Sequence, residues 1–306
     1  MRDRNILLLG GGGFIGTALA QRLCENKFNV RILSRHFPAS QIEPNMIFHK
    51  GELDDREILD RVLPECKTII HLASSTTPGS SSRQPALEAD QNITPTLRFL
   101  DILQNYKYFH MIFVSSGGTL YGNPESNPVN ETHPLNPLSF HGAGKVAIET
   151  FLKTFSTFPE RNTTIVRPSN VYGPGQPLRS GFGVIRTMLE HVHRGTMMEI
   201  WGDGTSIRDF LYIDDMLSAL IQLIDFHNGN NTYNVGSGIG YSLNKLKEIV
   251  ESVCGKKLPA IYRPSRKTDV KTIVLDSSRI IKKTKWNPRV SLEQGIELTW
   301  KWLKRQ

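Results

Sequence analysis

Three glycines near the N-terminus have the spacing of a dinucleotide-binding turn. Gly10, Gly13 and Gly16 follow a short apolar run at residues 6–9 and precede a helical pattern at residues 17–24. The first glycine permits a tight turn, the second lets the backbone approach a pyrophosphate, and the third lets the helix pack on the strand. Free N–H groups at the helix N-terminus then face the phosphates. The run favours a nucleotide site over a glycine-rich turn that binds nothing.

The bulk composition is typical of a soluble globular protein. The chain has 306 residues, of which 39% are hydrophobic and 22% are charged, which suits one large domain or two modest ones. No stretch approaches the roughly 18 apolar residues of a membrane helix, so we expect no membrane partner. The net charge is +8 and dispersed. This charge favours a solvated surface and an anionic small substrate over a nucleic-acid partner.

The cysteines exclude a metal site of the usual spacing. Cys24, Cys66 and Cys254 are odd in number and far apart. Such cysteines are typical of a reducing compartment, where they pack as small hydrophobic residues. We therefore predict a cytoplasmic protein that uses no metal.

Short apolar and β-branched runs alternate with helical patterns through the first half of the chain. They predict strands at residues 6–9, 30–33, 46–49, 68–72, 111–114 and 163–166. Continuous apolar runs of this length are typical of strands that are buried on both faces, hence of a parallel sheet. The sequence thus predicts an α/β fold of the Rossmann type, with a doubly wound parallel sheet over residues 1–168.

The pattern changes after residue 168, where glycine- and proline-rich turns become frequent. A helix is predicted at residues 243–253, with Gly255 placed to end it. We expect a smaller C-terminal α/β domain over residues 169–306, from which about 207–236 rejoins the first domain. The strand near 233–235 is the candidate for pairing with the first sheet.

A series of sequence blocks resembles the NAD-dependent epimerase/dehydratase family of extended short-chain dehydrogenase/reductases, which includes UDP-glucose 4-epimerases. In chain order, the blocks are GGGGFIG (10–16), IIHLAS (69–74), VSSGGTLYG (114–122), VRPSNVYGPGQ (166–176), WGDGTSIRDFLYIDD (201–215), NVGSG (234–238) and RPSRKTDV (263–270). Each block is modest, but their joint order is specific. The resemblance implies a UDP- or dTDP-hexose substrate, bound mainly by residues 169–306. It also implies a homodimer formed through helices at 93–103 and 148–155, although both helices could simply pack on the sheet.

The resemblance also implies roles for individual residues. The expected cofactor contacts are Gly10, Gly13, Phe14, Ile15, Gly16, Ala73, Ser74, Asn92 and Lys145. The expected contacts to the substrate diphosphate are Asn170, Arg208 and Arg266. A guanidinium fork fits two phosphate oxygens at once, whereas the alternative for each arginine is a surface ion pair.

The end of the second predicted strand departs from the pattern of NAD-binding members. These carry Asp or Glu there, which accepts hydrogen bonds from the ribose hydroxyls. This chain has Ser34 followed by Arg35. Because arginine attracts a 2′-phosphate, the pair favours NADP over NAD. Arg35 could instead stack on the adenine or point to solvent.

The catalytic Tyr-x-x-x-Lys motif is also changed. Residues 139–145 read SFHGAGK, so Lys145 is kept and His141 replaces the tyrosine. In the family this tyrosine moves the proton of a sugar hydroxyl. A histidine has an ordinary pKa of about 6.5, and Lys145 and the nicotinamide charge should lower it. A neutral imidazole can still accept or donate one proton.

The position of the family's catalytic Ser or Thr is occupied by Gly117, with Ser116 and Thr119 as neighbouring hydroxyls. Thr119 is placed to supply the missing group. With two altered positions, a nucleotide-sugar 4-epimerase is the leading hypothesis. The alternatives are an NADPH-dependent nucleotide-sugar 4-ketoreductase and a catalytically impaired nucleotide-binding module.

Overall fold

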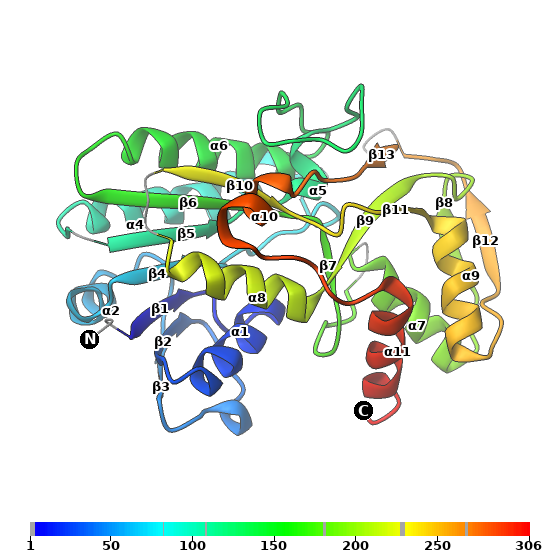
Figure 1. The fold of residues 1–306 in the computed structure, drawn as a ribbon, viewed down its shortest axis with the longest axis horizontal. Helices are drawn as coiled ribbons and strands as arrows, with labels where there is room; N and C mark the ends of the chain where they lie inside the picture. Colours follow the sequence, from blue (N-terminus) through cyan, green and yellow to red (C-terminus); the bar gives the residue numbers. More distant parts are fainter. Residues whose placement is uncertain (1–3, 82, 108, 180–181, 227–229, 267–268) are drawn as a thin grey trace.

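A sheet of seven parallel strands forms the centre of the larger part of the molecule (Figure 1). The computed structural model describes residues 4–81, 83–107, 109–179, 182–226, 230–266 and 269–306. The strand order is β10-β6-β5-β4-β1-β2-β3, and each neighbouring pair is parallel. The strands are β1 (Asn5–Leu9), β2 (Asn29–Ser34), β3 (Met46–Lys50), β4 (Thr68–His71), β5 (Phe109–Val114), β6 (Arg161–Pro168) and β10 (Asn231–Val235). The predicted α/β fold and its six N-terminal strands are confirmed.

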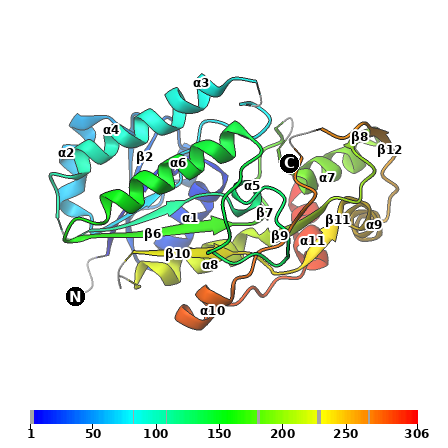
Figure 2. The ribbon, with the colours of Figure 1, turned by 90° about the horizontal axis from the view of Figure 1, so that it is seen from above.

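Helices cover both faces of this sheet, as the strand periodicity requires (Figure 2). In β1, Ile6 and Leu8 pack in one apolar core, whereas Leu7 and Leu9 pack in a second core on the other face. The first core includes residues of α1 (Phe14–Glu25) and α8 (Ile213–Ile224). The second includes residues of α2 (Arg56–Val62), α4 (Thr94–Leu103) and α6 (Phe140–Phe155). This alternation makes the sheet doubly wound.

Local sequence explains where several helices begin and end. α1 begins at Phe14, three residues before the expected start, with Gly13 as its N-cap. The Ser139 side chain caps α6 by accepting a hydrogen bond from the Gly142 N–H. α4 does not start at residue 93, because a π-helical turn, η3 (Ala89–Ile93), joins it to α3 (Pro85–Glu88). Such turns are frequent at functional sites.

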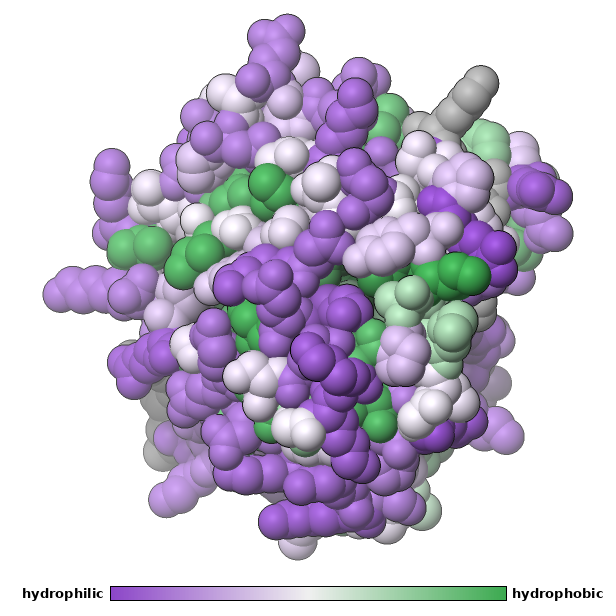
Figure 3. Space-filling view, turned by 90° about the vertical axis from the view of Figure 1, so that its right-hand side faces the viewer, coloured by the Kyte–Doolittle hydropathy of each residue, from purple (hydrophilic) through white to green (hydrophobic). Residues whose placement is uncertain are grey.

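The remaining strands, together with three helices, lie beyond the carboxyl ends of the large sheet (Figure 1). These strands are β7 (Asn170–Tyr172), β9 (Ile207–Tyr212), β11 (Gly240–Ser242) and β13 (Thr272–Ile273) in one sheet, and β8 (Met198–Trp201) and β12 (Ala260–Arg263) in another. The helices are α7 (Val184–Arg194), α9 (Leu243–Cys254) and α11 (Leu292–Leu303). Four short elements lie elsewhere along the chain: η1 (Ala39–Gln41), η2 (Leu63–Glu65), α5 (Gly117–Leu120) and α10 (Ser278–Thr284). The predicted helix ends at Gly255, whose φ of +66° suits glycine. The outer face of this part, seen in Figure 3, is mostly hydrophilic, with hydrophobic side chains in small groups.

The chain crosses between the two parts several times. β9 belongs to the smaller sheet, after which α8 packs against α1 and β10 pairs with β6. The expected return of the strand near 233–235 to the first sheet is therefore confirmed. Across the part of the chain that the structure describes, there is no helix with the length and hydropathy that a membrane span needs.

Candidate active site

The candidate site lies at the carboxyl ends of adjacent parallel strands. The glycine turn follows β1, Ser34 and Arg35 end or follow β2, and Ala73 and Ser74 follow β4. The order of the strands along the chain reverses between β1 and β4. In open α/β sheets, this switch point is where ligands bind.

The glycine turn is closely packed at two positions and open at a third. A Cβ at Gly10, whose φ is +79°, would lie 2.5 Å from the Ala73 Cα atom. A Cβ at Gly16 would lie 2.6 Å from the Gly11 Cα atom, so this glycine lets the helix approach the strand. A Cβ at Gly13 would meet only the Gly10 carbonyl oxygen, at 3.6 Å. Gly13 is thus the glycine that leaves room for a ligand.

The start of α1 is suited to hold a pyrophosphate. Gly13 provides no side-chain cap, and the first turn, which includes the half-buried Phe14 and Ile15, carries no acidic residue. The N–H groups there are therefore available to an anion, and the helix dipole favours it. The open turn and uncapped helix fit a dinucleotide.

Sequence reasoning missed Gly12, where a Cβ would lie 1.8 Å from the His36 carbonyl oxygen. Its signal was its place in the run of four successive glycines at residues 10–13.

Arg35 bridges two of the loops at this edge of the sheet. Its side chain is exposed, and Nη2 donates a hydrogen bond to the Ser75 Oγ atom at 3.2 Å. Among the described residues it makes no salt bridge, which leaves its charge available to a phosphate. The Ser34 Oγ atom lies beside the glycine turn, 2.9 Å from where a Cβ of Gly12 would be.

His141 and Lys145 project from the same face of α6, since they are four residues apart. Both are buried, with exposed fractions of 8% and 4%. Burial lowers the pKa of His141 to about 3, and the charge of Lys145 adds to this effect. The predicted direction is the one that the structure gives, so His141 is neutral at pH 7.

The side chain of Lys145 reaches from α6 to the end of β5. Its Nζ atom donates to the Val114 carbonyl oxygen at 3.3 Å and lies 4.9 Å from the centre of the Phe113 ring. Burial lowers its pKa to about 8, although Glu88 and Glu149 oppose the shift. A lysine that is close to losing its proton near neutral pH is typical of functional sites.

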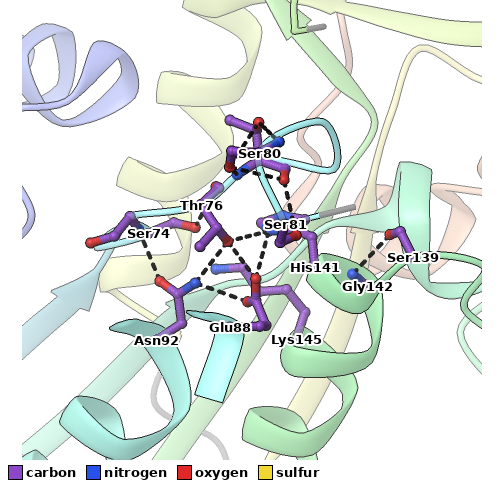
Figure 4. A network of polar contacts seen from close by, with 12 residues as sticks. Ser74, Thr76, Ser80, Ser81, Glu88, Asn92, Ser139, His141, Gly142 and Lys145 are labelled. Carbon is purple, nitrogen blue, oxygen red and sulfur yellow. Dashed lines mark hydrogen bonds and ion pairs between the residues drawn. The ribbon is translucent and has the colours of Figure 1, made fainter. Parts of the chain in front are cut away.

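His141 belongs to a polar network that sequence reasoning missed (Figure 4). The Thr76 Oγ atom lies 3.1 Å from His141 Nδ1 and donates to Glu88 Oε2 at 2.5 Å. Asn92 donates to both Thr76 and Glu88, and its Oδ1 atom accepts from the Ser75 N–H. The only signal in the sequence was the four-residue spacing of Glu88 and Asn92 in a helical segment. The Ser74 side chain, by contrast, makes a local bond, in which Oγ donates to the Thr76 carbonyl oxygen at 3.4 Å.

The hydroxyls near Gly117 are not joined to this network. A Cβ at Gly117 would lie 2.6 Å from the Leu275 Cδ1 atom, so the position has no room for the family's serine or threonine without a shift of its surroundings. Thr119 Oγ1 donates to the Ser116 carbonyl oxygen at 3.4 Å. Among the described residues, neither hydroxyl bonds to His141 or Lys145.

The residues expected at the substrate diphosphate lie in the smaller part of the fold. Asn170 Nδ2 donates to the Asp209 carbonyl oxygen at 2.8 Å. Arg208 Nη1 donates to the Ile207 carbonyl oxygen at 2.9 Å, and no acidic side chain among the described residues forms a salt bridge with it. Burial lowers the pKa of its guanidinium, with Asp269 opposing the shift. A half-buried arginine without an ion-pair partner is suited to a phosphate.

Arg266 is exposed and follows β12. Its Cζ atom lies 3.9 Å from the centre of the Trp201 ring, at the end of β8. This cation–π contact holds the guanidinium at the surface without using its hydrogen-bond donors.

The sequence profile of the NAD dependent epimerase/dehydratase family matches residues 6–236. The chain belongs to this family. It is 32% identical to a putative UDP-glucose 4-epimerase of Methanocaldococcus jannaschii, over 98% of both chains. It is also 30% identical to a dTDP-4-dehydro-6-deoxyglucose reductase of Escherichia coli, over 97% of this chain and 96% of that protein. The family is one of enzymes that act on nucleotide sugars, and these two relatives include both an epimerase and a reductase.

Solved structures agree with the fold. The UDP-glucose 4-epimerase of Thermotoga maritima with UDP-glucose has a TM-score of 0.92 and 32% identity, over 98% of this chain and 99% of that chain. The UDP-glucose 4-epimerase of Thermus thermophilus in complex with NAD has a TM-score of 0.90 and 27% identity, over the same shares. A pyridine dinucleotide is thus typical of the family to which this chain belongs.

Proposed function

We propose that the protein is a nucleotide-sugar 4-epimerase that acts on a UDP- or dTDP-hexose through a bound pyridine dinucleotide. The observation that carries the proposal is the buried pair of His141 and Lys145 beside the carboxyl ends of the strands. The family resemblance favours the epimerase. When bound, the dinucleotide supplies a site that takes up and returns a hydride.

Separate groups of residues bind the cofactor and the substrate in this proposal. The turn at Gly10, Gly13 and Gly16, with Phe14 and Ile15, holds the pyrophosphate end of the cofactor. Ala73, Ser74 and Asn92 line the loop and helix beside it, and Lys145 bonds to the nicotinamide ribose. Asn170, Arg208 and Arg266 hold the substrate diphosphate, where the two guanidinium groups neutralise its charge.

His141 is the proposed proton carrier. Because its imidazole is neutral at pH 7, it can accept the proton of the sugar 4-hydroxyl and later return it. The imidazole is shorter than the phenol that it replaces, so the sugar must bind closer to α6 or a water must bridge the gap. Thr119, or alternatively Ser116, would supply a second hydroxyl to orient the sugar.

Turnover of one accepted nucleotide sugar tests the proposal. Wild type is compared with His141→Phe and His141→Tyr while the interconversion of the two sugars is followed by chromatography. We expect His141→Phe to slow the reaction by about 10²- to 10⁴-fold, the usual contribution of one acid–base group. His141→Tyr should retain turnover, because it restores the family residue at the same spacing from Lys145. An unaffected Phe variant would show that His141 is a bystander, and activity only in the Tyr variant would indicate a nucleotide-binding module.

Arg35 favours a second candidate, an NADPH-dependent 4-ketoreductase. The guanidinium of Arg35 is exposed and forms no salt bridge with any residue that the structure describes, which suits the 2′-phosphate of NADP. NADPH is a consumed reductant in such a reaction. The two activities differ in stoichiometry. An epimerase leaves the amount of reduced cofactor unchanged, whereas a reductase oxidises one NADPH for each 4-keto sugar that it reduces.

A further inference from the structure

We propose that Thr76 and Glu88 are positioning residues that fix the neutral tautomer of His141, with the proton on Nδ1 and the lone pair on Nε2. The inference rests on the proposed function, in which His141 carries a proton. It also gives a role to the buried side chains of Thr76 and Glu88, which the Tyr-x-x-x-Lys motif does not include. Figure 4 shows Thr76 between Glu88, Asn92 and His141.

The direction of the network is set by a backbone group. The Ser75 N–H can only donate, and it lies 2.9 Å from Asn92 Oδ1. This contact fixes the orientation of the Asn92 amide, so Nδ2 faces the rest of the network. Nδ2 carries two hydrogens, and it donates one to Thr76 Oγ1 and one to Glu88 Oε1, each at 2.8 Å.

The Thr76 hydroxyl passes this direction on to His141. A hydroxyl has one hydrogen to donate and two lone pairs that accept. One lone pair accepts from Asn92, and the hydrogen goes to Glu88 Oε2 at 2.5 Å, because an ionised carboxylate only accepts. The second lone pair faces His141 Nδ1 at 3.1 Å. The Nδ1 atom must therefore carry the hydrogen of the neutral ring.

Because the network is buried, its hydrogen bonds are held in this one direction. The exposed fractions of Thr76, Glu88 and Asn92 are 5%, 2% and 4%, so bulk water does not compete for these bonds. Glu88 is closely fitted against α6, because a Cβ at Gly144 would lie 2.6 Å from its Cγ atom. An unmade bond at any of these atoms would have a high free-energy cost.

The consequence is a base that is ready on the free side of the ring. No described residue hydrogen-bonds to His141 Nε2, and the side chain keeps 10% exposure. The lone pair on Nε2 is therefore available to a hydroxyl proton, and when it accepts this proton no other proton has to move. Glu88 Oε2 lies 3.8 Å from Nδ1 and then offsets the new charge of the imidazolium.

Nitrogen NMR of the purified protein tests the tautomer directly. The protein is labelled with ¹⁵N-histidine, and the signals of His141 are assigned among the 9 histidines by comparison with His141→Phe. We expect the wild type to show a protonated Nδ1 and an unprotonated Nε2. Glu88→Gln should reverse the tautomer. Because Asn92 donates to Oε1, the amide nitrogen of the glutamine faces Thr76 as a donor, and the Thr76 hydroxyl must turn its hydrogen toward Nδ1.

Turnover and matched variants separate positioning from folding. Glu88→Gln and Thr76→Val should lower kcat at least 10-fold with little change in KM, and Thr76→Ser should restore it, since serine keeps the hydroxyl. Thr164→Val is the control, because it removes a buried hydroxyl that lies 2.8 Å from a different histidine, His110. It should leave the tautomer of His141 and kcat unchanged.

The outcomes are distinct. A wild type with the proton on Nε2, or a Glu88→Gln variant that keeps it on Nδ1, would overturn the inference even if the enzyme is active. The expected tautomers in a protein without turnover would support the inference and contradict the proposed function instead. Thermal midpoints of all variants show whether a loss of kcat comes from unfolding.

Discussion

Replacing His141 by phenylalanine should make the protein less sensitive to acid. Burial, with a contribution from Lys145, lowers the pKa of His141 to about 3 in the folded state. In the unfolded chain an ordinary histidine has a pKa of about 6.5. Above that pH both states are neutral and the full stability is present. As the pH falls from about 6.5 toward 3, the unfolded state binds a proton that the folded state does not, so stability is lost.

The magnitude follows from this window. Each pH unit below the unfolded pKa removes about 1.4 kcal/mol, so wild type should lose about 2 kcal/mol through His141 between pH 7.5 and pH 5.0. His141→Phe removes this contribution. His71, which is fully buried, also has its pKa lowered to about 3, with Lys145 adding to the effect of burial. This second loss occurs in both proteins and cancels in the comparison.

Urea unfolding at the two pH values measures the difference. For each protein, the free energy of unfolding at pH 5.0 is subtracted from that at pH 7.5, so any effect of the substitution that does not depend on pH cancels. The result for His141→Phe should be smaller than that for wild type by about 2 kcal/mol. An unchanged pH dependence in His141→Phe would refute the reasoning, since it would mean that His141 is protonated or exposed in the folded protein.

Further predictions concern the ligands and the oligomer. Gly13→Val should abolish dinucleotide binding in a fluorescence titration, because the added side chain would block the approach of the backbone to the pyrophosphate. The fold should be retained, because a Cβ there meets only the Gly10 carbonyl oxygen, at 3.6 Å; unchanged binding would place the cofactor elsewhere. Arg35→Ala should weaken NADP binding by roughly 1–3 kcal/mol and leave NAD binding nearly unchanged, and equal losses for both would exclude a contact to the 2′-phosphate. Arg208→Lys should weaken UDP binding in calorimetry by about 10-fold, because it keeps the charge but loses the planar fork; full affinity would assign Arg208 to the surface. We also expect a homodimer formed through α4 and α6, where Phe151 is 49% exposed, so Phe151→Glu should give a monomer in light scattering; a monomeric wild type at micromolar concentration would contradict this.

Local features were read correctly from the sequence because their causes lie within a few residues. The short apolar runs predicted six parallel strands, and the glycine spacing placed a turn between β1 and α1. The four-residue spacing of His141 and Lys145 put both on one face of α6, and the neighbouring positive charge gave the direction of the histidine pKa. The order of the sequence blocks indicated the family that the comparison shows.

Contacts between distant segments were decided only by the tertiary structure. Thr76 is 65 positions from His141 and 12 from Glu88, and no periodicity relates residues at such separations. The π-helical turn before α4 also could not be predicted, because its residues are equally compatible with an ordinary α-helix.

The sequence by itself therefore determined which groups this protein has for chemistry: a glycine turn, a lysine and a histidine in place of a tyrosine. Only the tertiary structure decided the state of these groups. Burial sets the charge of His141, and the packing of the loop after β4 against α3 and α6 brings Thr76 and Glu88 to its ring. Desolvation and hydrogen-bond direction depend on everything that surrounds a side chain, and the folded chain alone supplies those surroundings.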